Sequence, residues 1–135
     1  METILSRPLE ENYDTLHPVD EISEFNAFLR NVVARYDDNV VMQAEYDRMQ
    51  NDLLHYAELH DDMNASDGTK FYKSMREIRR ARRRIKSENE LLYPIYNYIK
   101  GNAHFTADLN NLLGRCRSVK STVESRSYIA RTDVI

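Results

Sequence analysis

Apolar side chains between residues 42 and 63 are separated by alternating steps of four and three residues. This is the heptad spacing of a helix that packs lengthwise along another helix. The positions that share the spacing are Met42, Tyr46, Met49, Leu53, Tyr56, His60 and Met63. The pattern predicts a long helix over residues 38–66, paired with a second helix.

A turn is predicted directly after this helix. The segment Asn64–Thr69 collects turn-forming residues. Within it, Gly68 can adopt a left-handed backbone, and Thr69 can cap the helix that follows. The chain is therefore expected to reverse direction, with the turn centred on Asp67.

A second long helix is predicted over residues 70–100. Apolar residues recur on one side of it from Phe71 to Leu92. Pro94 removes a backbone hydrogen bond and predicts a kink. Two long amphipathic helices joined by a short loop form an antiparallel pair, so a helical hairpin is the expected centre of the fold.

Two shorter helices flank the hairpin. Apolar residues at helical spacing predict an N-terminal helix over residues 18–36 and a C-terminal helix over residues 106–125. Residues 1–17 are expected to form an extended arm, and residues 126–135 a frayed tail. The fold class is therefore all-α, with residues 1–135 forming a single helical domain.

The boundary between the first two helices is placed at Asp37 and Asp38. A carboxylate at a helix N-terminus accepts hydrogen bonds from free backbone N–H groups and faces the positive end of the helix dipole. A new helix is therefore expected to begin at these residues.

Composition favours helices and excludes several classes of protein. With three glycines and three prolines in 135 residues, the chain lacks the frequent turns of a β-sandwich or barrel. No apolar run reaches the length of a membrane span, so no membrane partner is expected. The N-terminus lacks the pattern of a signal peptide, and Cys116 is the only cysteine, which indicates a cytoplasmic location.

Charge is divided unevenly along the chain. Residues 1–67 hold sixteen acidic and four basic side chains, whereas residues 68–135 hold six acidic and fifteen basic ones. These counts give net charges of −12 and +9, which add up to the −3 of the whole chain. An acidic helix lying along a basic one would bring the two halves together.

Basic residues are concentrated in residues 70–86, which contain nine Lys or Arg and one acidic residue, Glu77. At about 100° per residue, several of these side chains point away from the apolar side of the helix. The outward group, called the basic stripe below, is Lys73, Arg76, Arg80, Arg83 and Arg84. It is the predicted binding surface for an acidic protein or for nucleic acid. The alternative is a solvated helix face with ion pairs across the hairpin.

Ion pairs across the hairpin are predicted from the position of the turn. If the turn centres on Asp67, the residues that come level are Arg82 with Asp52, Arg76 with Glu58, and Arg79 with His55. Arg82 falls on the apolar side, where an uncompensated charge costs several kcal/mol. We therefore predict that Asp52 binds Arg82, with Glu58 and Arg79 in further structural ion pairs.

Two acidic patterns are candidates for a catalytic site. Asp52, His55 and Glu58 form D-x-x-H-x-x-E, but each step of three residues rotates the side chain by about 60°, so the ends diverge too far to share one ion. The pairs Glu21/Glu24 and Glu58/Asp61 resemble the paired acidic motifs of MazG-type nucleotide pyrophosphatases. That resemblance implies magnesium bound by four carboxylates; the leading expectation remains no metal, no cofactor and no catalysis.

A second resemblance covers residues 40–92. The segment Asp52-Leu-Leu-His55-Tyr-Ala-Glu58-Leu59 and the basic helix after it resemble small proteins encoded by phages and prophages of Gram-positive bacteria. The resemblance implies a phage context and hence the host cytoplasm, and it implies no chemistry.

Three functions follow in order of preference. The first is a non-enzymatic phage accessory protein that binds and modulates a host or defence protein through a helical surface. The second is a nucleic-acid-binding protein that uses the arginine-rich helix, and the third is the metal-dependent nucleotide hydrolase. The heptad spacing also permits a homodimer, since two helices rarely bury their whole apolar surface alone.

Overall fold

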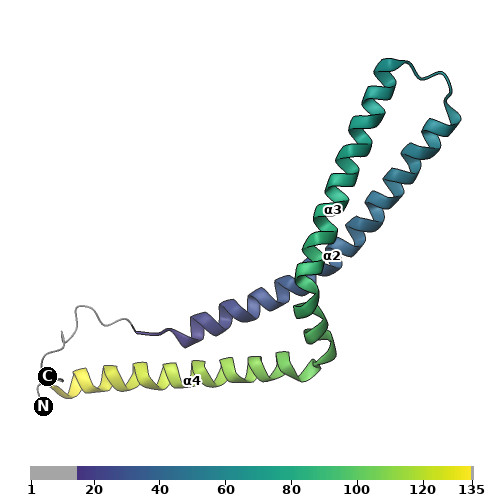
Figure 1. Ribbon diagram of the computed structural model, residues 1–135. Coiled ribbons are helices and arrows are strands. Elements are labelled where there is room, and N and C mark those ends of the chain that lie inside the picture. The colour runs from purple at the N-terminus through teal and green to yellow at the C-terminus, as the bar shows by residue number, and fades with distance from the viewer. Residues whose placement is uncertain (1–14, 135) are drawn as a thin grey trace, which may run out of the picture. The chain divides into compact units, whose positions relative to one another are not determined.

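A computed structural model describes the backbone of residues 15–134 and the side chains of residues 15–126. It contains three helices, α2 (Pro18–Leu59), α3 (Ala65–Gly101) and α4 (Ala103–Val134) (Figure 1). Residues 15–134 contain no strand, and the predicted all-α fold with its helical hairpin is confirmed. Most of the predicted N-terminal arm lies outside the described residues; of it, residues 15–17 are not helical.

Helix α2 is one helix of 42 residues, where the sequence predicted two. The prediction that a new helix begins at Asp37 and Asp38 was wrong. No glycine or proline lies between residues 19 and 59, and an aspartate is tolerated inside a helix when its side chain points outward. Both aspartates are exposed, and Asp37 accepts a hydrogen bond from the Tyr96 hydroxyl at 2.9 Å.

The turn lies at residues 60–64, earlier than predicted. Asn64 is the N-cap of α3: its side chain accepts a hydrogen bond from the Asp67 N–H at 2.8 Å, and the Asp67 carboxylate accepts one from the Asn64 N–H at 3.4 Å. This reciprocal capping box begins the helix before Gly68 and Thr69, which lie inside it. The prediction of a turn centred on Asp67 was therefore wrong, because the cap outweighed the turn preference of the glycine.

The described chain divides into two compact units, each taken by itself below. One contains residues 27–106, and the other contains the described residues up to 26 together with those from 107 onward. None of the described helices is long and apolar enough to cross a membrane.

The larger unit is the hairpin. Figure 1 shows α3 running back alongside α2, and α3 continuing through Pro94 with a change of direction in its C-terminal part. Leu29, Val32 and Met75 are buried in its core. Asn39 and Asn89 are buried there too, so the centre of the hairpin is partly polar.

The side of α2 that faces α3 shares Tyr46 and Leu53 with the predicted apolar side but is otherwise rotated from it. Met42, Met49 and Tyr56 are 39%, 45% and 53% exposed. The positions that are buried or half-buried at heptad spacing are Asn39, Gln43, Tyr46, Gln50, Leu53 and Ala57. The prediction placed the contact on one flank of the true interface, because hydrophobic periodicity does not count polar residues as interior.

The smaller unit pairs the start of α2 with α4. Leu113 is its buried apolar residue at 6% exposure, and the buried Asn26 donates from Nδ2 to Asn110 Oδ1 at 2.6 Å. Helix α4 begins at Ala103 and continues to Val134, past residue 125, where the predicted helix ended. The beginning of α2 at Pro18 agrees with the predicted boundary.

Candidate partner-binding surface

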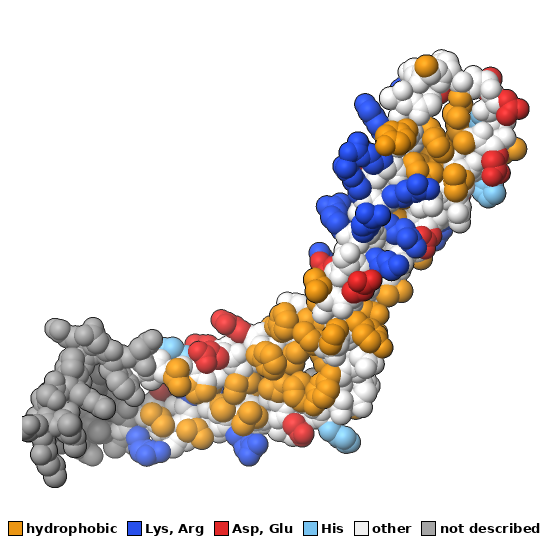
Figure 2. All heavy atoms as spheres, in the orientation of Figure 1, with side chains coloured by type: hydrophobic (Ala, Val, Ile, Leu, Met, Phe, Trp, Pro, Cys, Tyr) orange, Lys and Arg blue, Asp and Glu red, His pale blue; other side chains and the backbone are white. Residues whose placement is uncertain are grey.

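The five residues of the basic stripe are all exposed on α3. Within the part of the chain that has described side chains, none of them takes part in an ion pair. Figure 2 shows Lys and Arg side chains gathered along α3 in the hairpin. The stripe is therefore a continuous cationic surface without an internal counterion among those residues.

A shallow hollow in the surface lies at the C-terminal end of the stripe. The residues that line it are Glu77, Arg80, Arg83, Arg84, Ser87, Glu88 and Leu91. Leu91 is 79% exposed, so an aliphatic side chain stands beside the arginines. The surface offers both charge and apolar contact to a partner.

Arg82 is separate from the stripe, and its predicted partner was wrong. Its Nε donates to Asp47 Oδ1 at 2.5 Å, with side-chain exposures of 36% and 48%. The predicted partner, Asp52, is exposed. Arg82 thus pairs with a residue five positions earlier in α2 than predicted, in the direction that the earlier turn requires. Arg82 does pair with a carboxylate of α2, although not with Asp52.

The other predicted ion-pair residues also lie elsewhere. Glu58 was predicted to come level with Arg76, but its carboxylate lies 3.6 Å from Nδ1 of His55 in its own helix. Arg79 is exposed and forms no ion pair with the residues whose side chains are described. The shift of the turn accounts for both differences.

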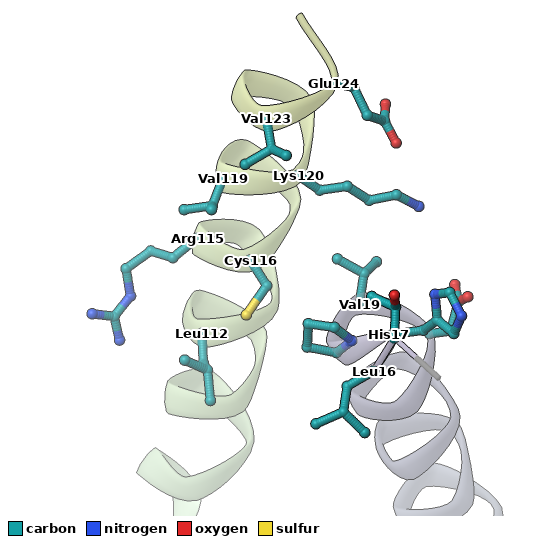
Figure 3. A pocket seen from close by; sticks show the side chains of 13 residues that line it. Leu16, His17, Val19, Leu112, Arg115, Cys116, Val119, Lys120, Val123 and Glu124 are labelled. Atoms are coloured by element: carbon teal, nitrogen blue, oxygen red, sulfur yellow. The ribbon is translucent and has the colours of Figure 1, made fainter. Parts of the chain in front are cut away.

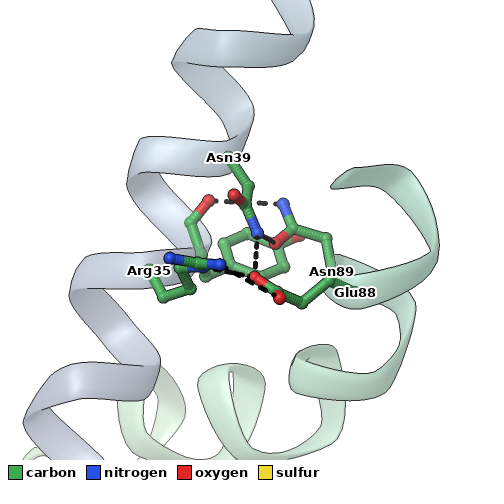
Figure 4. A network of polar contacts seen from close by, with 5 residues as sticks. Arg35, Asn39, Glu88 and Asn89 are labelled. Carbon is green, nitrogen blue, oxygen red and sulfur yellow. Dashed lines mark hydrogen bonds and ion pairs between the residues drawn. The ribbon is translucent and has the colours of Figure 1, made fainter. Parts of the chain in front are cut away.

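A polar cluster that the sequence analysis missed links α2 and α3 (Figure 4). Arg35 Nε donates to Glu88 Oε1 at 2.5 Å, and Asn39 Nδ2 donates to the same oxygen at 2.8 Å and to Asn89 Oδ1 at 2.9 Å. Asn89 Nδ2 donates to the Tyr36 carbonyl at 3.2 Å. The asparagines in the sequence could have indicated this cluster, because a polar residue at a heptad interface position commonly sets the register of two helices.

Hydrogen bonds in this cluster shift two pKa values. Those from Arg35 and then Asn39 hold the pKa of Glu88 below its usual range, because they favour the carboxylate form. The same bond to Glu88 raises the pKa of Arg35. Glu88 therefore stays ionised at neutral pH and anchors the crossing of the two helices.

Tyrosines pack beside the cluster. The rings of Tyr36 and Tyr96 are stacked with centroids 3.9 Å apart. The hydrogen bond from the Tyr96 hydroxyl to Asp37 raises the pKa of Tyr96. Tyr36 and Tyr96 therefore contribute to the packing between α2 and α3.

An apolar groove lies in the smaller unit between the start of α2 and α4 (Figure 3). Its volume is about 490 Å³. The apolar residues that line it include Leu16, Val19, Leu112, Cys116, Val119 and Val123. Cys116 is half-buried on this side of α4.

The two acidic pairs considered for magnesium binding lie in different units of the described chain. There, no group of three His, Cys, Asp or Glu side chains lies close enough to hold a metal ion. Glu21 and Glu24 belong to the smaller unit, whereas Glu58 and Asp61 belong to the hairpin.

Comparison of the chain with protein-family models, with curated proteins and with solved structures gives no match, so no relative's activity can be carried over to it.

Proposed function

We propose that this protein is a non-enzymatic binding protein that docks an acidic surface of a partner protein on its basic stripe. The observation that carries the proposal is the stripe itself: five exposed cationic side chains along one helix, without ion pairs to the described residues. Concentrated positive charge steers a partner of opposite charge and raises its association rate.

A protein partner is favoured over nucleic acid by the surroundings of the stripe. Glu77 and Glu88 line the same hollow as the arginines and would repel phosphates. The exposed Leu91 offers apolar contact that a phosphate backbone cannot use. A protein surface can pair with both charges and cover the leucine.

The resemblance to small phage proteins supports a particular kind of partner. Short phage proteins that act in the host cytoplasm often bind and redirect a host enzyme or defence protein. We therefore include modulation of such a protein in the proposed function, with the basic stripe as the contact.

The test is capture of a partner by the full chain and by a charge-reversed variant. The variant Arg76→Glu/Arg80→Glu/Arg83→Glu removes the middle of the stripe. A matched control, Lys100→Glu/Arg115→Glu/Arg117→Glu, changes the net charge equally at exposed positions away from it. The wild type and the control should retain one stoichiometric protein from host lysate, and the stripe variant should lose it at least roughly ten-fold.

Nucleic acid is the second candidate, favoured by the exposed Tyr72 at the start of the stripe, since aromatic rings stack on bases. An electrophoretic shift assay with a single-stranded and a double-stranded oligonucleotide addresses it. Tight binding that weakens steeply with salt and depends on the stripe would replace the protein proposal with this one. Equal capture of a protein by the stripe variant would also overturn the proposal.

A further inference from the structure

One flank of the hairpin carries an apolar row on α2, called the methionine face below. Met42, Met49 and Tyr56 are seven residues apart and between 39% and 53% exposed. At about 100° per residue, all three lie on one side of Asn39, which faces α3. This is the flank of the Arg35–Glu88 pair, opposite the flank of Arg82 and Asp47.

Helix α3 leaves room beside this row. Three half-buried residues of α3 lie on the same flank: Ser74 and Ala81, which are small, and Glu88, which is held by Arg35. Ala81 lines a shallow hollow between the helices together with Tyr46 and Arg84. An incoming helix can therefore approach the methionine face closely, because no large α3 side chain stands over it at Ser74 and Ala81.

The two edges of this flank carry opposite charge. On α2, Asp38, Glu45 and Asp52 repeat every seven residues beside the apolar row. On α3, Lys73 and Arg84 point to the same flank and are exposed. The flank thus has an apolar centre, an acidic edge and a basic edge.

We infer that two copies of this chain pair through their methionine faces, about a two-fold axis parallel to the hairpin. Rotation about that axis places the acidic edge of each copy against the basic edge of the other. It leaves the position of every residue along the hairpin axis unchanged. A two-fold axis running across the hairpin would place acidic edge on acidic edge. Only the first arrangement makes the surface complementary to itself, which an isologous dimer requires.

Heights along the hairpin identify the contact that should form. Asp47 of α2 pairs with Arg82 of α3. Glu45 comes two residues before Asp47, and Arg84 comes two residues after Arg82. In antiparallel helices these two positions are level, so Glu45 of each copy meets Arg84 of the other. The present partner of Glu45, Arg48 at 3.1 Å, belongs to an exposed pair within one helix, which competes weakly.

Burial of the apolar row supplies the main driving force, and the edges set the orientation. Two hairpins joined in this way form a four-helix arrangement in which the half-exposed methionines become interior. Glu77 lies on the basic edge near Lys73, so Arg84 is the better residue with which to test the pairing. The inference goes beyond the proposed function: it assigns Lys73 and Arg84 of the basic stripe to the dimer, whereas Arg76 and Arg83 point to the other side of α3 and stay available to a partner.

The experiment is sedimentation equilibrium of the full chain over a range of concentrations. We expect a mass of twice 16.0 kDa for the wild type. Met49→Glu should return the chain to 16.0 kDa, whereas Val40→Glu, at a 51% exposed position on the opposite side of α2 from Met49, should remain dimeric. Circular dichroism of each variant checks that the helices are retained.

A charge exchange tests the orientation independently of the apolar row. Glu45→Arg and Arg84→Glu should each weaken the dimer roughly ten-fold by placing like charges together, and the double variant should restore it. A wild type of 16.0 kDa at every concentration would overturn the inference. So would a dimer that Met49→Glu leaves intact, or one that the double exchange fails to restore. A chain that dimerises but captures no partner protein would overturn the proposed function and leave this inference standing.

Discussion

Asn39 donates from Nδ2 to Oδ1 of Asn89 at 2.9 Å across the hairpin, and the two residues are only 6% and 9% exposed. The second hydrogen bond of Asn39 goes to Glu88, and that of Asn89 goes to the Tyr36 carbonyl. If α3 slid along α2 by one turn, these amides would lose their partners. Each unpaired buried group would cost about 1–3 kcal/mol, so the pair holds the helices in one register.

Replacing Asn39 and Asn89 should affect the free energy of unfolding and the uniqueness of the helix register in different ways. We expect Asn39→Leu alone to lower the free energy of unfolding by about 1–3 kcal/mol, because Asn89 loses its partner. The double variant Asn39→Leu/Asn89→Leu should regain that loss or exceed it, yet sample more than one register. Chemical denaturation measures the first effect, and peak doubling in an amide NMR spectrum measures the second. Additive losses in the two single variants would show that the residues do not act together.

Acid should weaken the hairpin through Glu88. Its pKa is lower in the folded chain than in the unfolded one, so its contribution to stability is complete above the unfolded value of about 4.3. That contribution is lost as the pH falls through the folded pKa. We expect the Tm of the wild type to fall more between roughly pH 5 and pH 3 than that of Glu88→Gln. Glu90→Gln, at an exposed neighbouring position, should follow the wild type; parallel curves for all three proteins would contradict the prediction.

The ion pair between Asp47 and Arg82 can be distinguished by experiment from the predicted pair between Asp52 and Arg82. A double-mutant cycle between Asp47 and Arg82 should give a coupling energy of about 0.5 kcal/mol, since both side chains are partly exposed. The same cycle between Asp52 and Arg82 should give a value close to zero. Thermal denaturation of the alanine variants measures both couplings. A larger coupling energy for Asp52 and Arg82 than for Asp47 and Arg82 would support the pairing predicted from the sequence.

The smaller unit should depend on Leu113. Removing this buried side chain as Leu113→Ala leaves a cavity and should cost about 2–3 kcal/mol. Its neighbour Leu112 is 41% exposed, so Leu112→Ala should cost under about 1 kcal/mol. Because the chain forms two compact units, proteolysis that reports cleavage within α4 is the more specific measurement. Equal protection of the two variants would show that Leu113 is not a core residue.

Several elements could be predicted because their signals are local. The start of α2 at Pro18 and the end of α3 near residue 100 follow from helix geometry and helical apolar spacing. The turn could not be placed correctly, because Asn64 and Gly68 both favour a helix boundary nearby. The capping box between Asn64 and Asp67 decided between them, and its two hydrogen bonds depend on a geometry that composition does not reveal.

The sequence by itself determined that the chain is helical, that it doubles back into a hairpin, and that arginines crowd one helix, since these depend on residues near one another in the chain. Only the tertiary structure decided which side of α2 meets α3. It also decided that Asp47 rather than Asp52 neutralises Arg82, and that Asn39 lies against Asn89. The physical reason is that a shift of a few residues in one turn moves every contact across a hairpin, while the helical propensity of each segment stays the same.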